Sequence, residues 1–479
     1  MRTPQIPRTM SQPSTPGDFR MEKDTMGEMR VPKNALYAAQ TQRAVDNFPI
    51  SGEPLPPSFV HALGLVKLSC ARVNHKLGKL DGKMAEAIEK AAREVADGKW
   101  DKEFPIDVFQ TGSGTSTNMN ANEVIASLAT RVLGTKVHPN DHVNMGQSSN
   151  DVIPATMHVA AVMQIENTLL PAMHDLHDAL AAKAVAFDSI VKTGRTHLMD
   201  AVPIRLGQEF SGYARQVELG IQRVEATLPG LRELAIGGTA VGTGLNAPDG
   251  FGSMVAEELS RASGTEFTEA ANHFEAQGAQ DAYVFTGGAL TTVAASYMKM
   301  ANDIRLMGSG PQGGLGELQL PAVQPGSSIM PGKVNPVICE AVIQVGAQVT
   351  GNCQVVAIGS QWGQLDLNTM LPVMTRNLLE SVRLLANVSR VFKTKLLDGL
   401  EANVERANSF VEKSISMATA LNPLIGYEKA AAIAKESHKT GRTVREIAYE
   451  KSGLTRKQVD DALDPRKQTY PGGEGSGGG

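Results

Sequence analysis

Two long stripes of apolar residues restrict the fold of this chain more than any other feature of its sequence. Apolar side chains recur at intervals of three and four residues along two stretches, namely Val162, Ile165, Leu169, Met173, Leu176, Leu180 and then Leu206, Phe210, Tyr213, Val217, Ile221, Val224, Leu228. This spacing places each set on one face of a helix. Asn150 and Asp151, both good N-cap residues, precede the first stripe, and Pro171 should bend that helix or mark a local break.

The second stripe ends at Pro229-Gly230, and three more helices are expected at about 272–307, 335–360 and 371–397. Segments with strand-like alternation are almost absent, and aromatic residues make up 5% of the chain, so an all-α bundle is favoured over a β-sandwich. A helix of ~35 residues is ~50 Å long at ~1.5 Å per residue. Because a small monomer cannot cover faces of that length, we expect the bundle to be shared between subunits.

The chain has 479 residues, which is enough for several folding units. We expect a disordered extension (1–20), an N-terminal domain (21–147), a central long-helix domain (148–404), a small helical C-terminal domain (405–470) and a flexible tail (471–479). Residues 1–20 contain arginines and prolines but neither an apolar core nor a clear amphipathic helix. A disordered extension is therefore favoured over a cleaved targeting segment.

Net charge and cysteine content narrow the classes of function. A formal charge of −4 provides no broad attraction to nucleic acid or to an anionic membrane surface. Cys70, Cys339 and Cys353 form no Cys-x-x-Cys pair, and their odd number argues against a disulfide framework, so a cytoplasmic protein is expected. We expect no apolar run that approaches the ~20 residues of a membrane span.

Four polar clusters interrupt the helical patterns, at 111–118, 138–151, 192–201 and 326–336. In the first, hydroxyls and glycines precede a helix, where free backbone N–H groups and the positive helix end can bind an anion. A solvated N-cap loop is the alternative reading, and this segment alone favours it by roughly two to one. In the second, His138 and His142 lie around a proline without a helical His-x-x-x-His face, so no metal site is predicted.

The third and fourth clusters contain the groups best suited to acid–base chemistry and anion binding. His197 could act as a general acid or base, although a lone histidine is more often structural. Seven glycines and four prolines between Gly308 and Gly332 exclude a regular helix, and this flexible segment could close over an anion. Its donors gather at the start of the next helix: Ser327, Ser328, Lys333 and Asn335. Glu340 follows on that helix, where it could orient an imidazole.

Nucleophilic catalysis by a serine is an alternative use of the fourth cluster. The six-residue separation of Ser327 and Lys333 does not match the Ser-x-x-Lys pattern, and the chain contains no Gly-x-Ser-x-Gly elbow. It also contains neither a dinucleotide fingerprint nor a Walker loop. Anion binding, with His197 as a candidate acid or base, is therefore the favoured interpretation.

The segment Gly326–Pro336 (GSSIMPGKVNP) resembles the signature of the fumarase/aspartase superfamily, and the other three clusters follow in that family's order. The likeness extends from about Glu22 to about residue 470 and includes the run AQTQRA at 39–44. It implies an all-α, three-domain homotetramer with a twenty-helix core, in which three subunits build each active site. It implies dicarboxylate substrates and neither a cofactor nor a metal.

The resemblance also implies a reaction and a set of site residues. A base removes a proton next to a carboxylate, an aci-carboxylate intermediate forms, and a leaving group departs from the adjacent carbon. Ser327 would be the base, and His197, held by Glu340, would assist the leaving group. The two carboxylates would be bound by Ser113, Gly114, Thr115, Ser148, Ser149, Asn150, Thr196, Ser328, Lys333, Val334 and Asn335. A second dicarboxylate site would consist of His138, Pro139, Asn140 and Asp141.

Three positions distinguish between branches of the family. Aspartases typically carry Gln, Thr and Ala where this sequence has His197, Ser149 and Gly332. Expulsion of hydroxide needs acid assistance, whereas an ammonium group leaves already protonated, so His197 favours the fumarase branch and reversible hydration of fumarate to L-malate in the tricarboxylic acid cycle. Aspartate ammonia-lyase is the alternative. A recruited structural role, as in crystallins, is less favoured because Ser327, His197 and Lys333 are all present.

Overall fold

The computed structural model describes residues 19–471, so residues 1–18 of the expected extension and 472–479 of the expected tail lie outside the described residues. The chain forms two compact units. Unit 1 contains the segments up to Pro171, Gln222–Thr292 and Ala347–Leu385, and unit 2 contains Ala172–Ile221, Val293–Gly346 and the chain from Ala386 onward. Each unit therefore draws on three separate segments, and the linear division at 147 and 404 stays a prediction.

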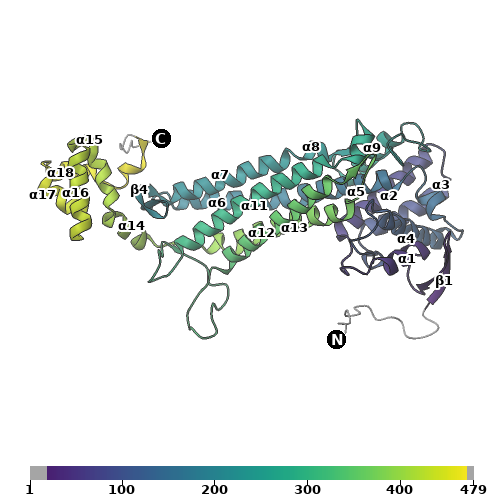
Figure 1. Ribbon diagram of the computed structural model, residues 1–479, viewed down its shortest axis with the longest axis horizontal. Coiled ribbons are helices and arrows are strands. Elements are labelled where there is room, and N and C mark those ends of the chain that lie inside the picture. Colours follow the sequence, from purple (N-terminus) through teal and green to yellow (C-terminus); the bar gives the residue numbers. More distant parts are fainter. Residues whose placement is uncertain (1–18, 472–479) are drawn as a thin grey trace. The chain divides into compact units, whose positions relative to one another are not determined.

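Helices dominate both units, which confirms the all-α class. They are α1 (Ala39–Asn47), α2 (Pro57–Lys76), α3 (Gly82–Ala96), α4 (Thr115–Leu133), α5 (Ser149–Gln164), α6 (Leu170–Ala186), α7 (Leu206–Glu225), α8 (Leu228–Leu231), α9 (Phe251–Ser263), α10 (His273–Gly278), α11 (Asp281–Met307), α12 (Val337–Ser360), α13 (Leu371–Lys395), α14 (Val404–Lys413), α15 (Asn422–Ile425), α16 (Tyr427–Thr440), α17 (Val444–Lys451) and α18 (Arg456–Ala462). Figure 1 labels most of them in chain order.

Both apolar stripes are buried, as predicted. Every residue of the two stripes is at most 7% exposed. A π-helical turn, Ile165–Leu169, lies immediately before Pro171, so the expected local break is confirmed. Proline has no N–H to donate to the preceding turn, and the wider turn accommodates that loss.

The N-cap of α5 is Ser148 rather than Asn150 or Asp151, so this detail of the prediction is wrong. The Ser148 hydroxyl accepts a hydrogen bond from the Asn150 backbone N–H, and the Asp151 carboxylate accepts one from the Ser148 N–H at 2.9 Å. Asp151 is fully buried and also accepts from the backbone of Gly237 and Thr239. Its side chain is thus occupied as the reciprocal half of a capping box.

Close helix contacts build each unit separately. In unit 1, α2 packs against α3, α5 and α9 (Figure 1). A Cβ on Gly64 of α2 would lie 2.6 Å from the Ala96 nitrogen of α3, so only glycine permits this close approach. In unit 2, Phe210 of α7 makes edge-to-face contact with Phe187 and Tyr213. A second apolar core in unit 2 joins α14, α16, α17 and α18 around Ile433.

Strands are more numerous than the sequence suggested, and they form five two-stranded sheets within the described range. They are β1 (Phe19–Asp24), β2 (Gly27–Pro32), β3 (Val191–Thr196), β4 (Met199–Arg205), β5 (Glu233–Leu234), β6 (Thr268–Glu269), β7 (Leu318–Gln319), β8 (Gly363–Gln364), β9 (Leu367–Asn368) and β10 (Glu401–Ala402). The first begins inside the extension expected for residues 1–20. The cluster 192–201 lies in the β3–β4 hairpin, because α6 already ends at Ala186.

Three expected helices differ in their limits. The stretch 272–307 is divided into α10 and α11, because Ala279 between them adopts an extended backbone with ψ of 173°. The next helix begins at Val337, after Pro336, and α13 ends at Lys395.

One helix, α12, is long and apolar enough to cross a membrane by length and composition alone. Its most apolar window has a mean hydropathy of 1.2, and a third of that window is buried. The expectation that no apolar run approaches a span is therefore wrong by this measure, because Glu340 is the single charged residue of the helix. The core helix of a globular protein passes the same test.

Candidate active site

The predicted site residues divide between the two units. Unit 1 holds Ser113–Thr115, His138–Asp141 and Ser148–Asn150. Unit 2 holds Thr196 and His197 on the β3–β4 hairpin, the loop 326–336 that leads into α12, and Glu340 on that helix. Each set is described below within its own unit.

The hydroxyl-rich loop before α4 is held in a fixed shape. Gly114 has a left-handed backbone with φ of 71°, and the Ser113 and Thr115 hydroxyls lie 2.8 Å apart. The Gly112 carbonyl accepts a hydrogen bond from the Leu371 N–H at the start of α13, and a Cβ on Gly112 would lie 1.9 Å from the Thr369 oxygen. The glycines therefore let the loop dock on its neighbours while its hydroxyls surround the positive end of α4.

The second helix start in unit 1, at Ser148–Asn150, is equally constrained. Besides the capping box, the Asn150 side chain donates to the Ala240 carbonyl at 2.8 Å. Ser149 is 9% exposed, and its hydroxyl accepts a hydrogen bond from Asn118 Nδ2 at 2.9 Å. Two helix N-termini with hydroxyl side chains thus supply the donors that a carboxylate requires.

A buried polar layer lies beneath Ser149, and the sequence analysis missed it. Lys67 of α2 is completely buried, and its Nζ donates to Asn144 Oδ1 and Gln147 Oε1, each at 2.9 Å. Asn118 joins Asn144 to Ser149. Burial lowers the pKa of Lys67 to about 7. The available signal was a lysine within the segment 62–71, whose other residues are apolar, glycine or serine, because a lone charge on a buried face needs a reason.

The proposed second site is an exposed π-helical turn, Pro139–Val143. His138 Nδ1 lies 3.2 Å from an Asp141 carboxylate oxygen, and it also accepts from the backbone N–H groups of Asn140 and Asp141. Val143 is buried and anchors the turn. The four predicted residues therefore form one local cluster on the surface of unit 1.

In unit 2, His197 occupies the tip of the β3–β4 hairpin. Thr196 pairs with Met199, so His197 and Leu198 are the two turn residues, and their φ angles are 55° and 62°. Two left-handed residues in a two-residue loop make a type I′ turn, which normally requires Gly or Asn. Leu198 is 74% exposed. Such strained, exposed backbone is concentrated at functional sites, and His197 itself is exposed.

Buried ion pairs hold strand β3 of this hairpin, and the sequence analysis did not identify them. Arg195 of β3 donates one hydrogen bond from each of its two terminal guanidinium nitrogens to the Glu317 carboxylate, each at 2.9 Å, and Glu317 is fully buried. Lys192 lies 3.5 Å from Glu317 and 3.2 Å from Glu209 of α7. Glu317 is only ten residues before Ser327. The pair therefore connects the strand that carries His197 to the segment that leads into the Ser327 loop.

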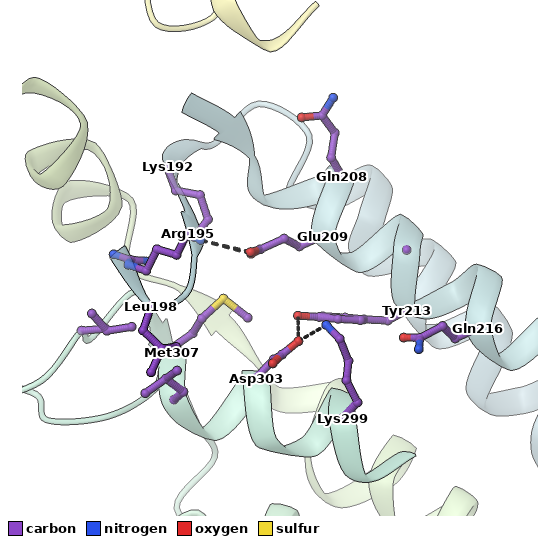
Figure 2. Close-up of a pocket in the computed structure, with 13 residues that line it drawn as sticks. Lys192, Arg195, Leu198, Gln208, Glu209, Tyr213, Gln216, Lys299, Asp303 and Met307 are labelled. Atoms are coloured by element: carbon purple, nitrogen blue, oxygen red, sulfur yellow. Dashed lines mark hydrogen bonds and ion pairs between the residues drawn. The ribbon is translucent and has the colours of Figure 1, made fainter. Parts of the chain in front are cut away.

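These ion pairs line a cavity of about 430 Å³ within unit 2. Figure 2 shows Lys192, Arg195 and Glu209 on one side of it, with Tyr213, Asp303 and Lys299 linked on another. Leu198 and Met307 also line it. Because this cavity lies against the hairpin, charge pairing of Lys192 and Arg195 on β3, rather than packing in that space, sets the position of the hairpin.

The loop 326–336 is organised by its own backbone. The Gly326 N–H donates to the Lys333 carbonyl at 2.9 Å, and Asn335 Nδ2 donates to the Gly326 carbonyl at 2.6 Å. Ser327 Oγ accepts hydrogen bonds from the N–H groups of Ile329 and Met330, at 3.2 and 3.1 Å. A Cβ on Gly326 would lie 2.3 Å from the Lys333 oxygen. The loop thus closes on itself, and Ser327 faces two backbone donors.

Glu340 and His197 are not paired within one chain. Glu340 is exposed in the first turn of α12, and among the described residues no hydrogen bond or ion pair joins it to His197. Cys70, Cys339 and Cys353 are buried free thiols. In the described range, no group of three or more His, Cys, Asp or Glu side chains is arranged to hold a metal.

Comparison with known proteins decides the family. A family profile described as lyase matches residues 27–351, and one described as the fumarase C C-terminus matches residues 417–469. The chain is 58% identical over 461 residues to the class II fumarate hydratase of Corynebacterium efficiens, covering 95% of this chain and 97% of that protein. It is 57% identical over 450 residues to the Mycobacterium tuberculosis enzyme of the same name, covering 94% and 95%.

The chain belongs to the class II fumarate hydratase family. A more distant relative, the mitochondrial fumarate hydratase of Danio rerio, is 52% identical over 461 residues, covering 95% of this chain and 90% of that protein. This membership favours the fumarase branch over the aspartate ammonia-lyase alternative, in agreement with His197, Ser149 and Gly332.

Solved structures of class II fumarase and of a related fumarate lyase superpose on this chain. The class II fumarase from Schistosoma mansoni superposes with a TM-score of 0.92 at 38% identity, covering 95% of this chain and all of that one. A Brucella melitensis protein described as fumarate lyase:delta crystallin bound to cobalt superposes with a TM-score of 0.91 at 44% identity, also covering 95% and 100%. The fold of the family is therefore the fold of this chain.

Proposed function

We propose that this chain catalyses the reversible hydration of fumarate to L-malate in the tricarboxylic acid cycle, through an aci-carboxylate intermediate and without a metal or cofactor. The observation that carries the proposal is family membership at 52–58% identity over nearly the whole chain, together with an intact loop 326–336. The roles of individual residues below are part of the proposal.

Binding of the two carboxylates is assigned to donors that different subunits of the proposed homotetramer bring together. Unit 1 provides Ser113, Thr115 and the start of α5 at Ser148–Asn150, where free backbone N–H groups and hydroxyls converge. Unit 2 provides Thr196 and the set Ser328, Lys333, Val334 and Asn335. Placing such donors where negative charge develops on the aci-carboxylate accelerates the reaction by about 10²–10³ for each donor.

Removal of the carbon-bound proton of malate is assigned to Ser327. A free serine hydroxyl is a poor base, so negative charge on its oxygen must be stabilised. The hydrogen bonds that Ser327 Oγ accepts from Ile329 and Met330 support this role, since they point at the atom that carries the charge. Lys333, six residues further along the same loop, adds positive charge.

Departure of the hydroxyl is assigned to His197, acting through a bound water. Its position at a strained, exposed turn supports this role, because the imidazole is presented outside its own unit's core. Glu340 would orient that imidazole. Since no contact joins the two within one chain, we assign them to different subunits of a homotetramer. A positioned acid or base of this kind contributes about 10²–10⁴ in rate.

Exposed apolar surface supports the proposed homotetramer. On unit 1, Phe285 of α11 is 59% exposed, Ile358 of α12 is 45% exposed, and Leu365 after α12 is 96% exposed. Large apolar side chains exposed on one chain are expected where subunits pack together. Light scattering of the purified protein should give the mass of four chains.

Two further assignments belong to the proposal. The cytoplasm is the proposed location, and His138–Asp141 is the proposed second dicarboxylate site.

The activity is tested with purified protein, L-malate and a metal chelator, by following the ultraviolet absorbance of the fumarate double bond. We expect fumarate to form from malate and malate to form from fumarate. Formation of fumarate and ammonia from L-aspartate, with no reaction of malate, would establish the ammonia-lyase alternative instead. An inactive protein that still binds dicarboxylates would point to the recruited structural role.

The role of His197 is tested by His197→Gln. We expect kcat for malate dehydration to fall about 10²–10⁴-fold, because the hydroxyl then leaves without an acid. His174→Gln is the matched control, since His174 is an exposed histidine on α6. Full activity in His197→Gln would remove His197 from the mechanism.

A further inference from the structure

Lys67 is a buried cation that the proposed reaction does not use. It lies within α2, is completely buried, and forms no ion pair among the described residues. Its Nζ contacts only neutral acceptors, the side-chain oxygens of Asn144 and Gln147. Burial lowers the pKa of Lys67, while Asp151 and Cys70 raise it. Burying a cation without a carboxylate partner is costly, so a functional gain is the expected compensation.

The ammonium group determines which way the Asn144 amide faces. An ammonium can only donate hydrogen bonds. Asn144 Oδ1 accepts from Lys67 at 2.9 Å, and from Asn118 Nδ2 and Asn122 Nδ2 at 3.2 Å each. If this amide were reversed, its own NH₂ group would face three donors. Lys67 therefore fixes the Asn144 oxygen toward the interior.

The orientation of Asn144 is passed on to Asn118 and then to Ser149. The two N–H bonds of Asn118 Nδ2 are directed to Asn144 Oδ1 and to Ser149 Oγ, the latter at 2.9 Å. A reversed Asn118 would place its oxygen against the Asn144 oxygen, which is repulsive. Asn118 Oδ1 has no partner in the described part of the chain, so the observed orientation is imposed by Asn144. Ser149 is thereby restricted to accepting a hydrogen bond on its inner side.

The consequence concerns the hydroxyl proton of Ser149. Because its oxygen already accepts from Asn118, the Ser149 hydroxyl must direct its own proton elsewhere, and within the described residues it donates to none. Ser149 keeps slight exposure at the start of α5, where its proton can reach a ligand. A donor aimed outward is what a carboxylate requires.

We propose that Lys67 is a positioning residue for dicarboxylate binding, which sets Ser149 as a hydrogen-bond donor to a substrate carboxylate through Asn144 and Asn118. The same ammonium holds Gln147, whose NH₂ group donates to the Val143 and Met145 carbonyls, so it also fixes the turn that leads into Ser148. This inference rests on the proposed function, because the substrate-binding role of Ser149 belongs to it.

The test compares Lys67→Met, Ser149→Ala and the double variant in the intact protein. We expect each single change to raise KM for fumarate and for L-malate about 10- to 100-fold, the loss expected for one hydrogen bond to a charged group, with kcat little changed. The KM of the double variant should not exceed the higher of the two single-variant KM values, because both changes remove the same bond. Lys76→Met, the same substitution at an exposed lysine on α2, is the control and should leave KM unchanged.

Binding of succinate, an unreactive dicarboxylate, is measured by calorimetry on the same proteins. We expect Lys67→Met to weaken it as much as it raises KM. An unchanged KM and succinate affinity in Lys67→Met, or effects of Lys67→Met and Ser149→Ala that multiply, would overturn the proposal. If Lys67→Met fails to assemble, Asn118→Ala decides the matter with the same expectations. Failure of the proposed function is separate, because it appears as an inactive wild-type protein.

Discussion

The buried pair between Arg195 and Glu317 provides the sharpest test of how the His197 hairpin is held. Glu317→Gln keeps the shape of the side chain but removes its charge. Arg195 then loses one of two bonds of 2.9 Å, and Lys192 at 3.5 Å loses its partner's charge, while Glu317 itself has no solvent exposure. Breaking one partner of a buried pair costs about 3–5 kcal/mol, because the remaining charge stays uncompensated. Glu209 remains beside Lys192, so we expect about 3 kcal/mol.

That loss translates into a shift in thermal unfolding. For a unit of roughly 200 residues, about 3 kcal/mol lowers the midpoint by about 6–12 °C. Differential scanning calorimetry measures the shift, and Glu218→Gln is the control, because Glu218 pairs with Arg215 at the surface of α7 and should leave the midpoint unchanged. The double change Arg195→Met with Glu317→Met should restore more than half of the loss, since the Arg195 charge is removed together with its partner and Lys192 keeps Glu209. A fall of less than about 2 °C in Glu317→Gln would refute the reasoning.

Two other predictions follow from single residues. Burial lowers the pKa of Lys67 from 10.5 to about 7. The unfolded chain therefore binds one more proton than the folded chain between these values, and the stability of unit 1 should rise with pH from about 7 toward 10.5. Lys67→Met should abolish that rise in thermal midpoints measured across this range, and an equal rise in the variant would contradict it. Gly326→Ala places a Cβ 2.3 Å from the Lys333 oxygen and 2.9 Å from the Asn335 nitrogen, so the loop must open. We expect kcat/KM for malate to fall at least ~10²-fold with an unchanged circular dichroism spectrum, and near-normal activity would show that the closed loop is dispensable.

The long helices could be predicted because their signal is local. Intervals of three and four residues placed the two apolar stripes on helix faces, and all of those side chains are buried. The glycines and prolines between Gly308 and Gly332 likewise excluded a regular helix there. The hairpin of β3 and β4 escaped prediction because its turn has non-glycine residues, His197 and Leu198, at positive φ. Local propensity disfavours such a turn, and the tertiary contacts of Arg195 beside it override that preference.

The sequence by itself determined the helical class, the family and the identity of the candidate site residues, because periodicity and motifs are properties of neighbouring positions. Only the tertiary structure decided which buried residues contact the candidate site residues or the strands and helices that carry them. Arg195 meets Glu317 across 122 positions, and Asn118 meets Ser149 across 31. No local pattern encodes such pairs, since their attraction exists only once folding has removed both partners from water. The loop 326–336 carries the family resemblance, and these buried contacts hold Ser149 and the His197 hairpin, each within its own unit.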